Sequence, residues 1–584
     1  MRRLASVTVL LAVLTALADP ADAEVPPVPP HGRFDQPYRG FAPPSTLLRD
    51  GSPAEAGLDP GPIDDALRRV RSWTEPDPGT GHPMFSGAVT LLAHDGVVVA
   101  RRASGYALRY ADAAGTELAE DRRIPMRTGT VFDLASLSKL FTSIVALQQI
   151  EAGRIELTAP VARYLPEFAT SGKGAITVEQ LLTHTSGLEP DLPLWRDWPD
   201  IPSRFKAVLD VAPVNPPGST YLYSDLNMIA LQLLVQQVTG RRLDLLVRDG
   251  ITGPLGMAHT GYNPPPSARA SIAATEFESD PPRGLVWGEV HDENAWALGG
   301  VAGHAGVFST ADDLAVLGQA LLDGGSYAGH RILRPDTVRE MLTDYNGAFP
   351  GDAHGLGFEL DQRWYMGALT GPRTAGHTGF TGTTLVIDPA SRSIAILLTN
   401  RVHPNRNWGS INPARRAVAD GLARSLAVRP RRGPDAWASI IGDTTTNGAS
   451  ATLTTVPLAP RGDRLTVSFD AFVDADPADQ LLLESSSDGV SWRAVPVRAN
   501  GCGAPGGEVN ALTGYGDRCW WTVRAKLPAS GPLRLRWRYT AGDEYAGRGV
   551  YLDAIRVGDA AGTLLDAERD RDALTASGWR LATR

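Results

Sequence analysis

The sequence predicts an α+β (α/β) domain, an antiparallel sheet flanked by helices with an all-helical subdomain, followed by a β-sandwich. Strand-like runs occupy both ends of residues 51–428, and helical patterns fill the middle. The two ends of such a chain are expected to pair in one helix-covered sheet. Beyond a linker at 429–435, rich in arginine and proline, apolar and polar residues alternate between Gly and Asp turns. That alternation is typical of half-buried sandwich strands, which we place at 436–584.

The strands of the first domain are expected from short apolar runs. Residues 87–93 and 96–100 are two such runs, and the His94-Asp95 pair between them predicts a hairpin. Later runs supply strands from the other end of the domain, at 357–360, 383–387 and 393–400. Helical spacing of apolar residues predicts a helix after Leu58 and a closing helix at 414–426.

Length and composition limit the classes of function. A chain of 584 residues is too long for one ordinary core, so two or more domains are expected. Hydrophobic residues at 43% and charged residues at 21% describe a soluble globular protein, and a net charge of −9 argues against nucleic-acid binding. No cluster of cysteine and histidine has zinc-like spacing, so no metal or other cofactor is expected.

The N-terminus has the features of an export signal. Arg2 and Arg3 precede an apolar run at 4–18, and small residues at 21–23 offer a cleavage site before Glu24. The alternative is a retained membrane anchor, although the run is short for a span. We therefore expect residues 1–23 to be removed, leaving a secreted or cell-envelope protein without a transmembrane segment. A proline-rich leader at 24–50 would then drape over the domain or trail from it.

The sandwich region carries both cysteines of the chain, Cys502 and Cys519. An exported protein meets oxidising conditions, so we expect a disulfide between them; two free buried thiols are the alternative. Strand alternation is clearest at 465–472 and 533–539.

Other residues of this region could bind ligands. Trp520 and Trp521 could stack on a sugar, which would give the domain a glycan contact, although core packing is the commoner role. Asp543, Glu544 and Asp553 could hold calcium, although ordinary turn carboxylates are commoner.

The stretch around Ser136-x-x-Lys139 has the residue types needed for nucleophilic catalysis. Apolar residues after it recur at helical spacing, which places both side chains near a helix start and on one face. A serine hydroxyl needs a base to take its proton. Lysine can be that base if burial and the positive end of a helix lower its pKa, as we expect here. Alone, this motif is more often an ordinary helix start.

Two further stretches strengthen the assignment. Tyr223-Ser224-Asp225 follows a turn rich in proline and glycine and leads into an apolar helix. The run His377-Thr378-Gly379 comes before a strand-like segment. Ser-x-x-Lys, Tyr-Ser-Asp and His-Thr-Gly in this order resemble the three signatures of serine β-lactamases and penicillin-binding proteins, especially the class C β-lactamase and esterase branch.

Two more stretches, at 176–188 and 299–310, look like hallmarks of the same branch, and the resemblance covers roughly residues 50–428. It implies a β-lactamase-like fold for that domain. The histidines of these stretches, His184 and His304, are interpreted as structural supports near the site.

The resemblance implies roles for the matched residues. Ser136 would attack a carbonyl and form an acyl-enzyme, with Lys139 accepting or relaying its proton. Tyr223 would act with them as acid or base, its pKa lowered by the nearby cation. The N–H groups of Ser136 and Phe380 would bind the oxyanion, and Gly379 would let a strand edge approach the substrate.

Two positions depart from the family pattern. His377 stands where the family often has lysine; a neutral histidine attracts a substrate carboxylate less and makes binding pH-dependent. Asp225 stands where classical members have asparagine, and it either disfavours an anionic ligand or pairs with Lys139 and holds it protonated. Both changes weaken the case for efficient β-lactam hydrolysis and leave the acyl-transfer groups in place.

We therefore expect an exported serine hydrolase that cleaves an ester or amide of a small molecule or peptide. D-alanyl peptides, including peptidoglycan-derived ones, D-amino-acid amides and small esters are the candidate substrates. The alternatives are a β-lactamase, and a cell-wall or glycan-binding protein with an idle hydrolase domain.

Overall fold

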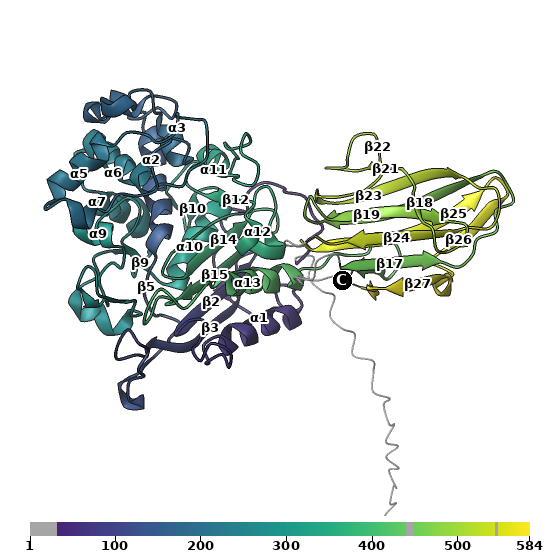
Figure 1. Cartoon of the computed structure of the whole chain (residues 1–584), viewed down its shortest axis with the longest axis horizontal. Helices are drawn as coiled ribbons and strands as arrows, with labels where there is room; N and C mark the ends of the chain where they lie inside the picture. Colours follow the sequence, from purple (N-terminus) through teal and green to yellow (C-terminus); the bar gives the residue numbers. More distant parts are fainter. Residues whose placement is uncertain (1–31, 440–448, 543–546, 584) are drawn as a thin grey trace, which may run out of the picture.

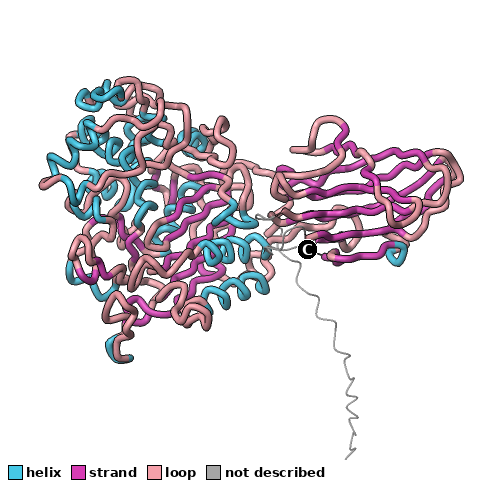
Figure 2. Tube along the Cα trace, viewed as in Figure 1, coloured by secondary structure: helices cyan, strands magenta, loops and turns pink. Residues whose placement is uncertain are grey.

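The computed structural model describes residues 32–439, 449–542 and 547–583. The predicted signal at 1–23, the first part of the leader, and Asp543 and Glu544 lie outside these residues. The chain forms a larger body of helices around a sheet and a smaller body of strands beside it (Figure 1). Figure 2 shows the same division, with nearly all helix in the larger body. Within the described residues, none of the helices has the length and apolar character needed to cross a membrane.

The sheet of the larger body joins the two ends of its chain. Its strands run in the order β1-β3-β2-β15-β14-β13-β12, with β4 paired to β3. Their bounds are β1 (Arg49–Asp50), β2 (Gly87–His94), β3 (Val97–Leu108), β4 (Ile124–Pro125), β12 (Glu359–Leu360), β13 (Ala375–Thr378), β14 (Thr383–Asp388) and β15 (Ser393–Thr399). Strand β2 pairs antiparallel with β15, and Leu91 lies opposite Ile396. The predicted hairpin and the predicted pairing of the two ends are therefore confirmed.

Helices cover both faces of this sheet and form a separate helical region beyond it (Figure 1). Their bounds are α1 (Pro60–Ser72), α2 (Ser138–Glu151), α3 (Val178–Leu182), α4 (Leu194–Asp197), α5 (Ile201–Asp210), α6 (Asp225–Thr239), α7 (Leu243–Val247), α8 (Gly253–Leu255), α9 (Glu293–Ala297), α10 (Ala311–Leu322), α11 (Pro335–Met341), α12 (Arg363–Met366) and α13 (Asn412–Ser425). Shorter strands lie outside the main sheet: β5 (Phe132–Asp133), β6 (Gly261–Tyr262), β7 (Phe277–Glu278), β8 (Gly284–Leu285), β9 (Val307–Ser309), β10 (Ser326–Tyr327) and β11 (His330–Arg331).

Helix α2 is the central helix of the larger body. The sequence pattern marks one apolar face, and its members Leu140, Ile144 and Leu147 are indeed buried. The helix is nevertheless buried on nearly all sides, because it shares one apolar core with the sheet and with α6. Its first turn is therefore held rigidly inside the domain.

The smaller body is the predicted sandwich. One sheet runs β22-β21-β23-β18-β25-β16-β28, with β26 paired to β25, and the other runs β20-β19-β24-β17-β27. The bounds are β16 (Ala436–Ser439), β17 (Ser450–Thr455), β18 (Arg464–Asp474), β19 (Gln480–Ser486), β20 (Arg493–Ala494), β21 (Val497–Asn500), β22 (Glu508–Val509), β23 (Tyr515–Pro528), β24 (Arg534–Thr540), β25 (Gly549–Asp559), β26 (Gly562–Asp566), β27 (Leu574–Ser577) and β28 (Trp579–Ala582). Residues of β24 alternate between buried and half-buried, as predicted. The Cys502–Cys519 disulfide is also present.

Those suggested ligand residues of the sandwich that the structure describes have structural partners. Trp521 is buried in the sandwich core, and Trp520 packs on Phe472, with ring centroids 5.9 Å apart. The Asp553 carboxylate accepts hydrogen bonds from the N–H groups of Arg432 and Ala554 at 2.7 Å each.

A buried ion pair joins the two bodies. Arg518 Nη1 of β23 lies 2.6 Å from Asp388 Oδ2, at the end of β14, and both side chains are fully buried. Its other terminal nitrogen donates to the Leu369 carbonyl at 3.0 Å, and its guanidinium lies 4.0 Å from the ring centroid of Phe34. Phe472 and Tyr551 of the sandwich join Phe34 in an apolar cluster shared with the larger body. The described part of the leader therefore fills the junction.

The linker is also fixed in place. Arg431 and Arg432 each lie 3.2 Å from a carboxylate oxygen of Asp470, and Phe34 N–H donates to the Ala427 carbonyl at 2.7 Å. The linker thus holds the sandwich against the larger body and is not a free spacer.

We expect Arg518→Met to lower the free energy of unfolding by about 3–5 kcal/mol, because Asp388 would be left as an unpaired buried charge. Arg524→Met is the matched control, because Arg524 lies on the same strand with an exposed side chain. Calorimetric unfolding of the whole chain measures both variants. Equal transition temperatures for the two would contradict a structural role for the pair.

Candidate active site

Ser136 lies in a 3₁₀ turn, Ala135–Leu137, that leads directly into α2. Ala135 has a φ of +48°, a left-handed conformation that side chains other than glycine rarely adopt. Such strain persists only where the surroundings enforce it, and it is common at functional sites.

Asp133 enforces this turn. Its carboxylate accepts hydrogen bonds from the N–H groups of Ala135 at 2.9 Å and His291 at 2.6 Å. Its carbonyl accepts from the hydroxyl of Thr381 at 2.8 Å. One buried residue therefore ties the serine turn to two distant segments that border the site. No motif in the sequence marks Asp133, and its position three residues before the serine is the only local signal.

Lys139 Nζ lies at the centre of the site. It is fully buried, 2.8 Å from Ser136 Oγ, 2.7 Å from Asp225 Oδ1 and 3.3 Å from the His304 carbonyl oxygen. The ring centroid of Tyr223 is 4.7 Å away. Five residues from three of the predicted motifs thus meet here. An ammonium has three N–H donors, and these three oxygens match them in number.

The charge state of Lys139 differs from the sequence expectation. Burial has the largest single effect and lowers the pKa of the Lys139 ammonium, but Asp225 and Tyr223 together outweigh it, so the pKa is raised above its usual value. The prediction of a lowered lysine pKa is therefore wrong. The alternative, that Asp225 pairs with Lys139, is confirmed by their contact.

Tyr223 also differs from expectation. Burial raises the pKa of its hydroxyl to about 12; the charge of Lys139 opposes this rise, and Asp225 adds to it. The expected lowering of the phenol pKa is wrong, because desolvation outweighs the nearby cation. The hydroxyl remains within hydrogen-bonding reach of both Ser136 and Lys139.

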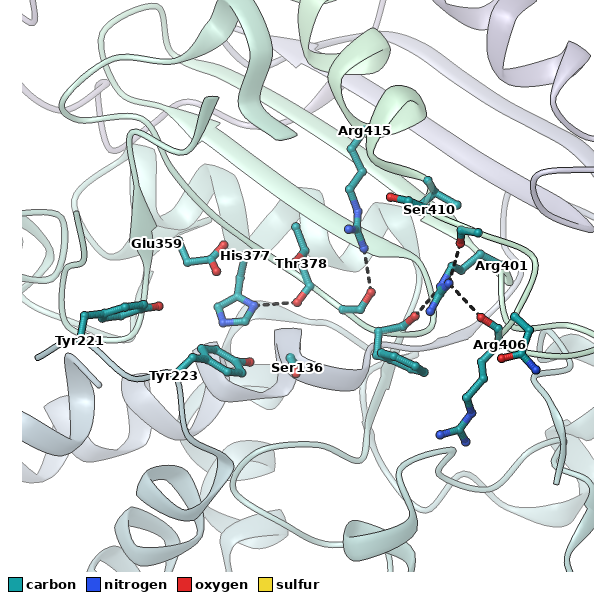
Figure 3. Close-up of a pocket in the computed structure, with 15 residues that line it drawn as sticks. Ser136, Tyr221, Tyr223, Glu359, His377, Thr378, Arg401, Arg406, Ser410 and Arg415 are labelled. Carbon is teal, nitrogen blue, oxygen red and sulfur yellow. Dashed lines mark hydrogen bonds between the residues drawn. The ribbon is translucent and has the colours of Figure 1, made fainter. Parts of the chain in front are cut away.

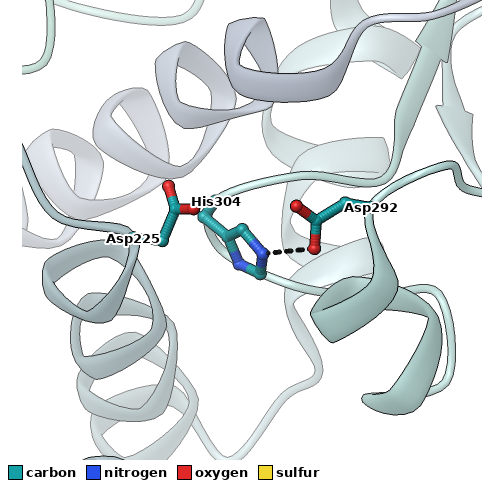
Figure 4. A group of neighbouring side chains, drawn as sticks. All are labelled: Asp225, Asp292 and His304. Carbon is teal, nitrogen blue, oxygen red and sulfur yellow. Dashed lines mark hydrogen bonds and ion pairs between the residues drawn. The ribbon is translucent and has the colours of Figure 1, made fainter. Parts of the chain in front are cut away.

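Asp225 borders a second charged pair (Figure 4). His304 Nε2 lies 2.9 Å from Asp292 Oδ1. Burial lowers the pKa of His304, but Asp292 and Asp225 outweigh burial and raise it. One ligand atom from each of Asp225, Asp292 and His304 lies within 4.8 Å of the others, an arrangement that could hold a metal ion. The Lys139 ammonium already supplies a cation beside Asp225.

Glu276, Glu278 and His291 form a second group of this kind. Arginines already lie beside its carboxylates: Arg406 Nε is 2.6 Å from Glu276 Oε2, and Arg283 Nη1 is 3.1 Å from Glu278 Oε2. The absence of a metal cofactor stays a prediction.

Gly379 and Phe380 follow β13 and pass beside the serine turn. A Cβ on Gly379 would lie 2.3 Å from the Leu134 carbonyl oxygen and 2.1 Å from Thr383 Oγ1, so only glycine permits this approach. Glycine is therefore required at 379 by the close approach of this segment to the serine turn, in addition to the predicted approach to a substrate. Within the described chain, neither the Ser136 N–H nor the Phe380 N–H donates a hydrogen bond. Both donors remain available to a ligand.

Ser136 borders a pocket of about 660 Å³ whose two ends differ in chemistry (Figure 3). Acidic, phenolic and imidazole groups lie on one side of the serine, and these are Tyr221, Glu359 and His377. Cationic groups lie on the other side, and these are Arg401 and Arg406. Phe380 forms part of the second end, and its ring centroid lies 4.8 and 5.5 Å from the guanidinium carbons of these two arginines.

His377 is buried and neutral. Burial lowers its pKa to about 3, so it does not titrate near neutral pH. The expected pH dependence of binding through His377 is therefore wrong. Its Nδ1 lies 2.8 Å from the Thr378 carbonyl, which can only accept, so Nδ1 carries the proton and Nε2 is an acceptor.

Arg415 is a site residue that sequence reasoning missed. It reaches the pocket from α13 and donates to three neutral oxygens: the Gly379 carbonyl at 2.8 Å, Thr384 Oγ1 at 3.0 Å and Asn412 Oδ1 at 2.9 Å. No carboxylate of the described residues forms an ion pair with it, and burial lowers its pKa to about 10. The sequence marks α13 only as a closing helix, and nothing local indicates that its first turn faces Ser136.

His184 supports the tyrosine loop, as predicted. Its Nδ1 accepts from the Ser224 N–H and the Asn227 side-chain amide at 3.1 Å each. His304 contributes more than support, because its carbonyl accepts from Lys139.

Comparison with known proteins identifies the family to which the larger body is similar. The β-lactamase family model matches residues 77–420. A putative D-alanyl-D-alanine carboxypeptidase of Escherichia coli (strain K12) is 32% identical over 395 residues, which cover 61% of this chain and 86% of that protein. A protein of the same description from Salmonella schwarzengrund is 33% identical over 409 residues, covering 64% and 90%. A penicillin-binding protein homologue from Caulobacter crescentus aligns with a TM-score of 0.48 at 22% identity, over 63% of this chain and 99% of that chain.

The family model spans more than half of the 584 residues, and it contains every predicted residue of the pocket. The resemblance predicted from the motifs is confirmed: the chain belongs to the β-lactamase family and is a serine hydrolase of the β-lactamase-related type.

Proposed function

We propose that the protein is an exported serine hydrolase that cleaves an ester or amide through an acyl-enzyme on Ser136. The observation that carries the proposal is the 2.8 Å contact between Ser136 Oγ and the buried Lys139 Nζ at a pocket of about 660 Å³. The features of an export signal at 1–23 support secretion or a place in the cell envelope.

The first step forms a bond between Ser136 Oγ and the substrate carbonyl carbon. The serine proton passes to the Lys139–Tyr223 pair, and the carbonyl oxygen becomes an oxyanion beside the N–H groups of Ser136 and Phe380. The pair then returns the proton to the leaving alcohol or amine as the carbon–leaving-group bond breaks. Water then attacks the acyl carbon and gives a proton to the same pair; the bond to Ser136 Oγ breaks, the pair returns the proton to Ser136, and the acid is released.

The base in this step must first be unprotonated. Burial raises the pKa of Tyr223 and Asp225 adds to that rise, while Asp225 and Tyr223 together raise the pKa of Lys139, so the unprotonated form of either is a minor species near neutral pH. Activity should therefore rise with pH through the alkaline range. Asp225 moves that rise to higher pH, whichever of the two accepts the proton.

The arginines favour a substrate with a carboxylate. Neither Arg415 nor Arg401 is in an ion pair with a described carboxylate, and the hydrogen bonds of Arg401 go to carbonyl oxygens such as that of Phe380 at 3.0 Å. A charge taken out of water without a counterion favours an anionic ligand. D-alanyl peptides with a free C-terminus meet this requirement, and the relatives described as putative D-alanyl-D-alanine carboxypeptidases support the same class.

A β-lactamase is the second candidate, because Arg415 supplies a cation that the neutral His377 does not. Nitrocefin hydrolysis far above background would favour it. The third alternative, an idle hydrolase domain beside a glycan-binding sandwich, is less favoured, because Ser136 and Lys139 are in contact and Trp521 is buried.

We expect Ser136→Ala to lose turnover by a factor on the order of 10⁴ or more and to lose labelling by a fluorophosphonate and a fluorescent penicillin, because the acylated oxygen is gone. Gel fluorescence and turnover of D-Ala-D-Ala peptides and short-chain esters measure both effects. Ser219→Ala, an exposed serine, should behave as wild type. A Ser136→Ala variant that labels normally would refute the proposal.

We expect Asp225→Asn to move the rising limb of the kcat/KM–pH profile to lower pH by about one unit or more, because the carboxylate no longer stabilises the protonated forms of Lys139 and Tyr223. Steady-state kinetics from pH 6 to 11 measure the shift. Asp210→Asn is the control, because it removes the partner of Lys206 in an exposed pair. An unmoved limb in Asp225→Asn would contradict the assignment.

A further inference from the structure

Glu359, on β12, is a carboxylate without a counterion. It is the one carboxylate among the described residues that line the pocket. No described basic side chain forms an ion pair with it, and its Oε2 is buried without a hydrogen-bond partner. Burial raises its pKa to about 7, even though the Tyr365 hydroxyl lies within hydrogen-bonding reach of the carboxylate and, like the more distant charge of Arg415, acts in the opposite direction. Carboxylates removed from water normally have a cation or several donors beside them, so this one lacks a partner that a ligand could supply.

The neighbouring groups at this end of the pocket can accept hydrogen bonds. His377 Nε2 carries no hydrogen and has no hydrogen-bond partner among the described residues. The residue is nevertheless buried, with an exposed fraction of 1%. Burial and the negative charge of Glu359 both raise the pKa of Tyr221, which places that phenol within the field of the carboxylate. Figure 3 shows these three side chains together on one side of Ser136.

A primary ammonium group suits this set of side chains, because it brings a positive charge and three N–H donors. We propose that this end of the pocket binds the protonated amino group of the substrate, with Glu359 as its counterion. The amine would lie on the side of Ser136 opposite Arg401 and Arg406 (Figure 3).

This inference rests on the proposed function and narrows its substrate class. The substrate is a peptide, amide or ester with a free amino group on one side of the scissile carbonyl, and not an N-acylated compound. With a carboxylate at the arginine end, such a molecule is a zwitterion whose two charges flank the reacting carbon. The substrate thus supplies a counterion for Glu359 at one end of the pocket and for Arg401 at the other.

The test compares D-alanine p-nitroanilide with N-acetyl-D-alanine p-nitroanilide at pH 7, using the full chain. Wild type should prefer the free amine by about tenfold or more in kcat/KM. Glu359→Gln keeps the size of the side chain and removes its charge. It should lower kcat/KM for the free amine by about 10- to 100-fold and change the acetylated substrate by less than about threefold. Glu340→Gln, an exposed glutamate on α11, is the matched control.

A wild-type preference for the acetylated substrate, or equal losses on both substrates in Glu359→Gln, would overturn the inference and leave the acyl-enzyme proposal standing. A second measurement needs no variant: benzylamine should protect Ser136 from fluorophosphonate labelling at least about tenfold better than benzyl alcohol. Equal protection would overturn the inference as well. Absence of any labelling in wild type would instead refute the proposed function itself, so the two failures are distinguishable.

Discussion

The site depends on one buried ammonium. Lys139 has lost its contact with water, and a lone charge in that position would be strongly unfavourable. Asp225, the first residue of α6, neutralises it, while Ser136 and the His304 carbonyl take its other hydrogen bonds. The positive ends of α2 and α6 meet here, so the carboxylate also opposes two helix dipoles. Positive potential is thus concentrated where an oxyanion would form, and Asp225 stabilises this arrangement in the absence of substrate.

The rest of the molecule holds the strand that faces this ammonium. Strand β13 carries His377 and leads into Gly379, and it pairs with β14, whose last residue is Asp388. Arg518 of the sandwich binds that aspartate, so the accessory domain stabilises the strand next to the one that borders the pocket. At the other end, Thr381 binds the carbonyl of Asp133, which fixes the serine turn. Buried polar contacts therefore stabilise both the strand that borders the pocket and the serine turn.

Much of the fold and the central residues could be predicted from the sequence, because period and motif are local signals. The hairpin after Gly87, the alternating sandwich strands and the group of Ser136, Lys139 and Tyr223 follow from such patterns. Charge states could not be predicted in this way. The pKa of a buried group depends on a balance between desolvation and neighbours that only the three-dimensional structure supplies, as Lys139 illustrates. Arg415 and Glu359 were missed for a related reason, because long-range packing alone brings α13 and β12 to the pocket.

The protonation state of Lys139 is the most direct test of this account. The chain has four lysines, Lys139, Lys173, Lys206 and Lys526, so labelling lysine with ¹³C and ¹⁵N gives few side-chain signals, and a Lys139→Arg sample assigns the relevant one. Its side-chain shifts can then be followed by NMR as pH rises. The account predicts that Lys139 remains charged up to at least about pH 10, near the range where an ordinary lysine titrates. A midpoint at about pH 8 or below would contradict it.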